Sequence, residues 1–466
     1  MDYRQETDLL GTLSIPVDAY YGVQTQRAIE NFQISHQILT SYPEFIQALG
    51  YVKKGAAKTN YELGILAKEL YEAIDKACDD VIEGKLNSEF PLDMIQGGAG
   101  TSINMNANEV IANRALEIMG HPKGSYQYCS PNDHINYAQS TNDAYPTAIK
   151  IALLLMHQKL RPQIQKAVDA FREKGKDFAS IIKMGRTQLQ DAVPMTLGQE
   201  FEAFACALEN DIHYLDLNSK ELLRINMGGT AIGTGINAPL KYEELCTKHL
   251  AEITGFELSS AADLIEATPD TGAYVSYSSA LKRLALKLSK ICNDLRLLSS
   301  GPKAGLHEIN LPAMQPGSSI MPGKVNPVIP EVVNQVCFRV IGNDLTISFA
   351  AEAGQLQLNV MEPVLSFSLM ESIQLMGNAL ETLVTKCIQG ITANQDICFG
   401  MVKNSIGIVT ALNPYIGYKN STKIAKEALA TGKSVYDLVL EYSLMSQEQL
   451  DEVLDPKNML QPHKKL

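Results

Sequence analysis

Apolar residues recur at alternating spacings of three and four between positions 274 and 298. The positions are Tyr274, Tyr277, Leu281, Leu284, Leu288, Ile291, Leu295 and Leu298. This heptad spacing predicts a long helix with a narrow apolar seam, and the following Gly301-Pro302 is an expected helix stop. Such a seam must be buried against other helices. The sequence therefore predicts a helix bundle, and it is compatible with a bundle built from several chains.

Helical periodicity extends over much of the remaining chain. Apolar residues recur at helical spacing from Ile149 to Phe171, and further helical stretches cover about 195–225, 331–350 and 360–390. Little of the sequence alternates with a period of two. We therefore predict a mainly all-α fold in three domains. These are an N-terminal domain (1–142), a central helical bundle (143–393) and a small C-terminal helical domain (394–466).

Composition excludes several classes of function. The chain has 466 residues and a formal net charge of −12, which disfavours nucleic acid and anionic membranes as partners. Its apolar runs are too short to span a bilayer. The eight cysteines are scattered, with no CxxC pair and no His/Cys cluster at metal-ligand spacing. We predict no metal and no cofactor, and we expect buried thiols in a reducing, cytoplasmic compartment.

The stretch from Pro316 to Glu331 is the most informative for function. Its four prolines and two glycines exclude a continuous helix or strand, so it is a shaped loop. It contains Ser318 and Ser319, one cation at Lys324 and one amide at Asn326, with no acid before Glu331. A loop that gathers donors and a positive charge within an acidic protein is suited to hold an anion.

Three predicted helices begin in the same manner, with small polar residues followed by proline. The three starts are Ser140–Asn142 before Pro146, Thr187-Gln188 before Pro194, and the loop 318–326 before Pro330. Each start would direct free backbone N–H groups and a positive dipole end at whatever lies in front of it. If the three ends converged, they would form a strong site for a dicarboxylate.

Taken singly, these features have simpler explanations. The turn Gln96–Ser102 and the segment Ser140–Asn142 could be a tight turn and a helix cap. The phosphate-loop pattern fails because five residues, not four, separate Gly317 from Gly323. The glycines at 233–235 follow a helical stretch rather than a strand, which argues against dinucleotide binding. His157 lies in an apolar helical stretch and is better explained as a core residue.

Taken together, the motifs resemble a known family. GGAGTS, QSTNDAYPTA, GRTQLQDAVP and GSSIMPGKVNP occur in the order and approximate spacing of the aspartase/fumarase superfamily, and the resemblance covers essentially the whole chain. YYGVQTQRAIENF and AEAGQLQLNVMEPV look like the ammonia-lyase branch rather than the fumarate hydratase branch. The resemblance implies a homotetramer with active sites composed from three subunits. It also implies an anti-elimination that releases ammonia from a small dicarboxylate, L-aspartate, and gives fumarate.

The resemblance also assigns roles to residues. Ser318 would be the general base, acting as an alkoxide on a loop that closes over the substrate, and the reaction would pass through an enediolate-like intermediate. The proposed ligands of the substrate carboxylates are Thr101, Thr187, Lys324 and Asn326, with a further donor from Ser319. The proposed ligands around the amino group and the second carboxylate are Ser140, Thr141 and Asn142.

One position departs from the pattern common in fumarases. Gln188 stands where they carry histidine, so a His–Glu proton relay with Glu331 is not available. Expelling hydroxide needs a general acid, whereas a protonated amine leaves as neutral ammonia without one. We therefore expect Gln188 to bind substrate by a hydrogen bond and to disfavour hydratase activity. Alternatives left open are a fumarate hydratase, an argininosuccinate-type or adenylosuccinate-type lyase, and a structural protein recruited from a lyase, as lens crystallins are.

Overall fold

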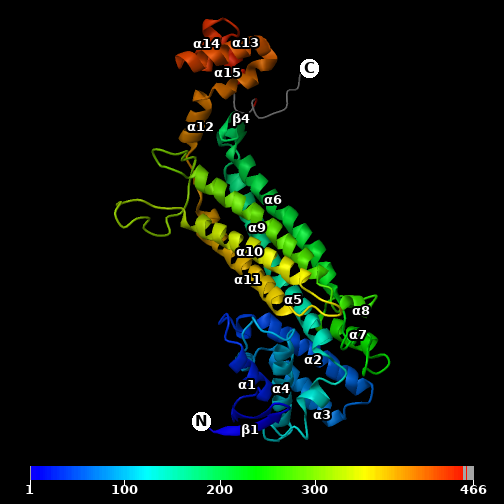
Figure 1. Ribbon diagram of the computed structural model, residues 1–466. Helices are drawn as coiled ribbons and strands as arrows, with labels where there is room; N and C mark the ends of the chain where they lie inside the picture. Colours follow the sequence, from blue (N-terminus) through cyan, green and yellow to red (C-terminus); the bar gives the residue numbers. More distant parts are fainter. Residues whose placement is uncertain (1, 455–457, 459–466) are drawn as a thin grey trace. The chain divides into compact units, whose positions relative to one another are not determined.

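The computed structural model describes residues 2–454 and 458, and it is mainly helical, as the sequence predicts (Figure 1). The chain divides into two compact units, which are described separately. The first unit comprises Met1–Arg161, His213–Ala285 and Phe338–Gly377, and the second comprises Pro162–Ile212, Leu286–Cys337 and Asn378–Leu466. The three-domain division stays a prediction, and part of its last domain (455–457 and 459–466) lies outside the described residues.

Five long helices make up the centre of the chain, and the boundary between the units falls inside each of them. They are α5 (Thr141–Asp177), α6 (Leu197–Ser219), α9 (Gly272–Leu298), α10 (Val328–Glu352) and α11 (Glu362–Lys386). All eight seam residues of α9 are buried, and the helix ends shortly before Gly301, as predicted. Burying one such leucine contributes about 1.5–3 kcal/mol, so the seam contributes to the core along the length of α9.

The first unit contains the N-terminal elements, most of which are helices. They are β1 (Tyr3–Asp8), β2 (Gly11–Pro16), α1 (Val23–Asn31), α2 (Pro43–Glu62), α3 (Lys68–Ile82) and α4 (Thr101–Ile118). Later segments add β5 (Arg224–Ile225), α7 (Tyr242–Thr254), β6 (Ser259–Ser260) and α8 (Leu264–Ala267). Helix α2 packs against α3, α4 and α7. Its buried face has apolar residues on both sides of Lys53, which matters for the site below.

The second unit contains a β-hairpin that the sequence analysis missed. The hairpin joins β3 (Ile182–Thr187) to β4 (Gln190–Thr196), and Pro194 pairs with Met184 inside it. The expectation that Thr187-Gln188 opens a helix is therefore wrong, since α6 starts only at Leu197. Gln188 and Leu189 form the two-residue turn, both with positive φ. The usual Asn-Gly signal for such a turn is absent, and proline is tolerated because a two-stranded hairpin consists of edge strands.

The C-terminal helices of the second unit share a core with this hairpin. They are α12 (Gln395–Asn404), α13 (Val409–Thr431), α14 (Val435–Glu441) and α15 (Gln447–Val453), and a short pair β7 (Ile309–Asn310) and β8 (Thr392–Ala393) precedes them. Ile182 and Met184 of β3 are buried together with residues of α12 to α15. The hairpin is therefore held at its base, while its turn is exposed.

Further sequence expectations can be checked in the described residues. Every cysteine is free, and all but Cys206 are buried, as expected for reduced thiols. His157 is buried and hydrogen-bonded to Tyr277 and Asp216, which fits its interpretation as a core residue. Within residues 2–454 and 458, no helix has both the length and the apolar character needed to cross a bilayer.

Candidate active site

The first group of predicted site residues lies where two helices begin. The backbone has positive φ at Gly98, Ala99 and Gly100, and this turn starts α4 at Thr101, whose side chain is exposed. Gly100 is needed here because a Cβ on it would overlap the ring of Tyr145 in α5. The close approach brings the N-terminus of α4 against the first turns of α5.

A hydrogen bond joins these two helix ends directly. Asn104, in the first turn of α4, donates from Nδ2 to Oγ1 of Thr141, the first residue of α5, at 3.2 Å. Ser140 caps α5, because its Oγ accepts from the backbone N–H of Asn142 at 3.2 Å. Thr101 and Ser140–Asn142 therefore lie at adjacent helix N-termini, which present unpaired N–H groups and positive dipole ends to an anion.

A glycine-rich loop holds the start of α5 from one side. Asn142 donates from Nδ2 to the carbonyl of Ala231 at 2.7 Å. The buried carboxylate of Asp143 accepts from the backbone N–H groups of Ser140, Gly228 and Thr230 at 2.9 to 3.0 Å. Burial raises the pKa of Asp143 to about 6, while these hydrogen bonds oppose the shift. In the sequence, the glycines of this loop suggested only a nucleotide-binding motif to be weighed, and the contact with Asn142 was missed.

A buried lysine beneath the helix ends was also missed. Nζ of Lys53 donates to side-chain oxygens of Asn104 at 2.7 Å, Gln139 at 2.8 Å and Asn136 at 3.2 Å. Burial lowers the pKa of Lys53 to about 7, and the charge of Asp143 opposes that shift. Three oxygens satisfy the three ammonium donors. The one available signal was a lysine at a core position of an apolar helical face.

The second group of predicted residues starts at the hairpin. Thr187 is the last residue of β3, and Gln188 forms the turn with Leu189; all three side chains are exposed. Below the turn, Arg186 pairs with the buried carboxylate of Glu308 at 2.6 Å, and Asp191 accepts from Ser405 at 2.8 Å. The hairpin therefore presents Thr187 and Gln188 from an anchored base.

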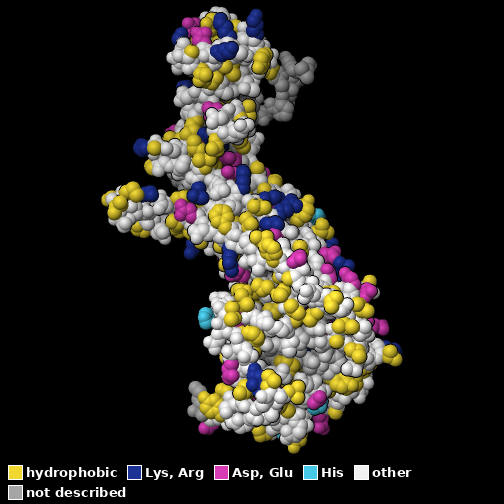
Figure 2. Space-filling view, viewed as in Figure 1, with side chains coloured by type: hydrophobic (Ala, Val, Ile, Leu, Met, Phe, Trp, Pro, Cys, Tyr) yellow, Lys and Arg dark blue, Asp and Glu magenta, His cyan; other side chains and the backbone are white. Residues whose placement is uncertain are grey.

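The loop between α9 and α10 carries the remaining predicted residues and stands away from the start of α10 (Figure 1). Two hydrogen bonds close the neck of the loop, where its two ends come together. The N–H of Gly317 donates to the carbonyl of Lys324 at 2.7 Å, and Nδ2 of Asn326 donates to the carbonyl of Gly317 at 2.8 Å. The loop carries exposed apolar side chains (Figure 2), and Ile320, Met321 and Val325 are among its exposed residues.

Within this loop, the hydroxyl of Ser318 accepts two backbone hydrogen bonds. Its Oγ accepts from the backbone N–H groups of Ile320 at 3.1 Å and Met321 at 3.0 Å. Hydrogen-bond donors directed at an oxygen stabilise negative charge on it.

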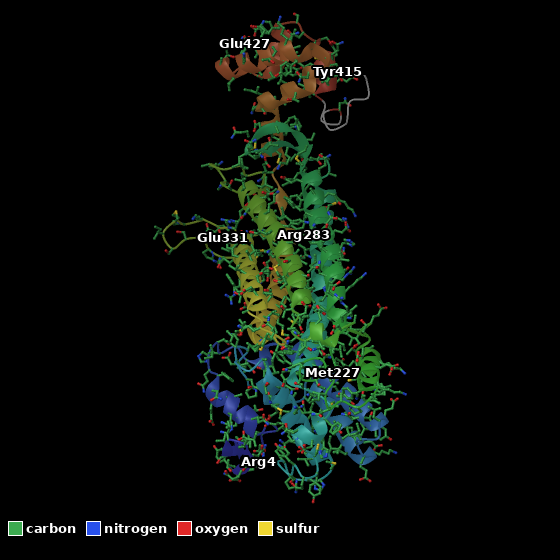
Figure 3. The ribbon with its side chains drawn as sticks, turned by 45° about the vertical axis from the view of Figure 1, so that its right-hand side comes forward. Arg4, Met227, Arg283, Glu331, Tyr415 and Glu427 are labelled. Carbon is green, nitrogen blue, oxygen red and sulfur yellow. The ribbon has the colours of Figure 1, made fainter. Side chains whose placement is uncertain are left out.

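The other polar residues of the loop face solvent or its neck. Ser319 and Lys324 are exposed, and Lys324 forms no ion pair with any residue that the structure describes. Asn326 uses its amide nitrogen to close the neck, which leaves its Oδ1 and one N–H for other partners. Glu331 lies in the first turn of α10, where the loop joins the helix (Figure 3).

The structure thus places the predicted residues in two sets. Thr101, Ser140, Thr141 and Asn142 belong to the first unit, and Thr187, Gln188, Ser318, Ser319, Lys324 and Asn326 belong to the second. Of the three predicted helix starts, those at Ser140 and at the 318–326 loop precede helices, and that at Thr187 does not. The start of α4 at Thr101 was not among the three predicted starts, and it contacts the start of α5.

The tight neck yields a prediction for Gly317→Ala. A Cβ at Gly317 would lie 2.5 Å from the carbonyl oxygen of Lys324 and 3.0 Å from the backbone nitrogen of Asn326, so the neck must open. Since loss of about 1 Å in positioning can cost 10²-fold in rate, we expect kcat to fall by on the order of 10²-fold while thermal stability changes little.

Gly400→Ala, in α12, is the matched control. A Cβ there meets no atom within 4 Å, so the change should stabilise the helix by about 0.5–1 kcal/mol and leave kcat unchanged. Steady-state kinetics and thermal melts of both variants would check the prediction. Equal kcat in Gly317→Ala and wild type would show that the neck does not position the loop.

Comparison with known proteins identifies the family. Residues 11–342 match the model of a lyase family, and residues 408–461 match that of the fumarase C C-terminus. The chain belongs to the aspartase/fumarase superfamily of lyases. It is 59% identical over 461 residues to the aspartate ammonia-lyase of Helicobacter pylori (strain ATCC 700392 / 26695), with 99% of this chain and 98% of that protein covered.

Other relatives agree with this membership. The aspartate ammonia-lyase of Escherichia coli (strain K12) is 57% identical over 460 residues, covering 98% of this chain and 96% of its own. The solved fumarate lyase:delta crystallin of Brucella melitensis bound to cobalt has 53% identity and a TM-score of 0.96, over 99% of this chain and 100% of that one. The class II fumarase of Schistosoma mansoni has 34% identity and a TM-score of 0.93 over 99% and 100% of the chains.

The names of these relatives indicate the class of enzyme. The chain is a lyase by family, and the curated relatives named above are carbon–nitrogen lyases. Among residues 2–454 and 458, no group of three or more His, Cys, Asp or Glu side chains is placed to hold a metal ion.

Proposed function

We propose that this chain is an aspartate ammonia-lyase that converts L-aspartate reversibly to fumarate and ammonia. The observation that carries the proposal is 57–59% identity to aspartate ammonia-lyases over nearly the whole chain. The hydroxyl, amide and cationic residues quoted for the family are all present at the two sets of positions described above. A small dicarboxylate is therefore the proposed partner.

In the proposed mechanism, Ser318 removes the proton from the carbon next to one substrate carboxylate. Its alkoxide takes the proton, and the electron pair of the C–H bond moves into that carboxylate to give an enediolate-like intermediate. The intermediate then forms the C=C bond and expels the amine as neutral ammonia with the C–N electron pair. The two N–H donors at Oγ of Ser318 support this role, because they stabilise the negative charge that a base must carry.

Stabilising the extra charge on the carboxylate is the main catalytic burden. Lys324, Asn326, Thr187 and Ser319 are the proposed carboxylate ligands of the second unit, with Gln188 as a further hydrogen-bond partner of the substrate. In the first unit, Thr101 and Ser140–Asn142 lie at the N-termini of α4 and α5, above the buried amino group of Lys53. This arrangement supports binding of a carboxylate there, with the amino group beside it.

We further propose a homotetramer in which three subunits contribute to each site. Phe338, Leu345 and Phe349 are 58–67% exposed and lie on one face of α10, since spacings of seven and four return to the same side of a helix. Such an apolar face supports association with helices of other subunits. Buried, free cysteines support a cytoplasmic location, where thiols stay reduced.

We attribute the expected selectivity for L-aspartate over L-malate to Gln188. Glutamine cannot transfer a proton, so the hydroxide of malate would leave without a general acid, whereas an ammonium group leaves as ammonia. We therefore expect fumarate to form from L-aspartate and not from L-malate. Following fumarate by its ultraviolet absorbance with each substrate in turn would test this.

The outcomes distinguish the alternatives. A rise with aspartate alone supports the proposal and the role of Gln188. Turnover of malate comparable to that of aspartate would contradict the argument from Gln188, and turnover of malate alone would make the chain a fumarate hydratase. Inactivity toward both would direct attention to larger succinyl-type substrates and then to a structural role.

A further inference from the structure

A buried cluster of four charges lies below the hairpin in the second unit. The carboxylate of Glu308 is fully buried and pairs with Nζ of Lys183 at 2.8 Å and Nη1 of Arg186 at 2.6 Å. Lys183, whose side chain is 2% exposed, also pairs with Glu200 at the start of α6. Two cations and two anions make the cluster neutral overall, and it takes no part in the mechanism proposed above.

The geometry of β3 brings both cations to the same carboxylate. Lys183 and Arg186 are three residues apart, so they would point to opposite faces of a regular strand. The pairing of β3 with β4 shifts register between Met184 and Arg186, and such a bulge adds twist and redirects side chains. A Cβ on Gly185, inside the bulge, would lie 2.8 Å from the carbonyl oxygen of Val193. The local backbone is therefore shaped so that both side chains reach Glu308.

Glu308 is also fixed through its own backbone. Its N–H donates to the carbonyl of Leu298, the last residue of α9, and its carbonyl accepts from the N–H of Asn394, both at 2.9 Å. The next two residues form β7, and the chain then runs from Asn310 to the Ser318 loop. On the other side of the ion pair, Arg186 directly precedes Thr187. Glu308 thus ties the base of the hairpin to the segment that leads into the loop.

Stability alone does not account for this arrangement. Buried ion pairs usually contribute little, because desolvation offsets their attraction, and apolar replacements are often as stable. The apolar core of α12 to α15 already covers one side of β3. What the charges add is direction, because Lys183 and Arg186 pair with the two oxygens of one carboxylate.

We propose that Glu308 is a positioning residue, which holds Thr187 and the entry to the Ser318 loop in register through Lys183 and Arg186. The inference rests on the proposed function, because it assigns Thr187 and Ser318 to one reaction. Glu308 acts through its two cationic partners and does not touch the substrate.

Glu308→Gln tests the proposal, since glutamine keeps the shape and removes the charge. We expect kcat/KM for aspartate to fall by on the order of 10²-fold, with a raised KM and weaker inhibition by succinate, a dicarboxylate that cannot react. Asp211→Asn is the matched control, because Asp211 is equally buried and pairs with Lys287 of α9 at 3.1 Å in the same unit. It should lower thermal stability and leave KM and the succinate inhibition constant unchanged.

A double variant separates positioning from stability. Glu308→Gln leaves Arg186 without its buried partner, and the added change Arg186→Met removes that unpaired charge. Thermal stability should therefore partly recover in the double variant, while KM stays raised. Recovery of KM together with stability, or the same KM in Glu308→Gln, Asp211→Asn and wild type, would overturn the proposal.

Two further comparisons cover the cases in which Glu308→Gln does not fold or wild type is inactive. If Glu308→Gln does not fold, Arg186→Met alone serves, because Glu308 keeps Lys183; a raised KM supports the proposal and an unchanged KM overturns it. If wild type does not turn over aspartate, the proposed function fails. Binding of succinate to wild type and Glu308→Gln would then still decide the inference: weaker binding to the variant supports it, and equal binding overturns it.

Discussion

Replacing Ser318 with alanine is expected to lower kcat for aspartate deamination by about 10²–10⁴-fold, the range typical for loss of a general base. The substitution removes the one oxygen in the loop that accepts two backbone N–H groups, from Ile320 and Met321. KM should change little, because the proposed base abstracts a proton rather than binding a carboxylate. Steady-state kinetics with fumarate detection would measure both constants.

The neighbouring hydroxyl provides the comparison. Ser319→Ala removes an exposed side chain that we propose as a carboxylate donor, so it should reduce kcat far less than Ser318→Ala does. If Ser318→Ala kept a kcat comparable to that of wild type, another group would have to be the base. Equal and negligible turnover in wild type and Ser318→Ala would favour a structural protein.

Replacing Lys324 with methionine should lower kcat/KM by about 10²–10³-fold, as removal of a donor that stabilises transition-state charge does in other enzymes. The ammonium group is exposed and forms no ion pair within the described part of the chain, so it is available to an anion. The backbone carbonyl of Lys324, not its side chain, closes the loop neck to Gly317. The substitution should therefore leave the loop intact and remove only the charge.

Lys68→Met is a suitable control for the loss of one positive charge. Lys68 is exposed in α3 and forms an i,i+4 pair with Glu72, and such pairs contribute little. We expect its kcat/KM to match wild type. Inhibition by succinate should weaken in Lys324→Met and not in Lys68→Met. Unchanged inhibition in both variants would remove Lys324 from the list of carboxylate ligands.

The local charges explain how an acidic chain could bind an anion. The formal net charge is −12, so the long-range field repels a dicarboxylate, and attraction must come from nearby groups. In the first unit these are the N-termini of α4 and α5 with Lys53 beneath them. In the second unit the exposed ammonium of Lys324 lies in the loop that carries Ser318. A charge that lies within a Debye length of an anion is screened less than more distant charges are.

Much of this protein could be determined from the sequence because its signals are local. The seam from Tyr274 to Leu298 specifies α9 through residues three and four apart, and the prolines and glycines of 316–331 exclude regular structure there. The family could also be recognised, since its motifs are short contiguous segments. The residues proposed for chemistry, such as Ser318 and Lys324, lie within those segments.

Tertiary structure alone decided what connects these segments. The β3–β4 hairpin depends on pairing and on a turn without the usual residues, so Thr187-Gln188 followed by Pro194 suggested a helix start instead. Lys53 gave only its position on an apolar helical face as a signal and Glu308 gave none, because a lysine or glutamate becomes a buried partner only through contacts with residues 51 to 125 positions away. Helical periodicity reports which face of one helix is buried. It carries no information on which distant side chain contacts a charged residue on that face. The arrangement of this site depends on such long-range contacts.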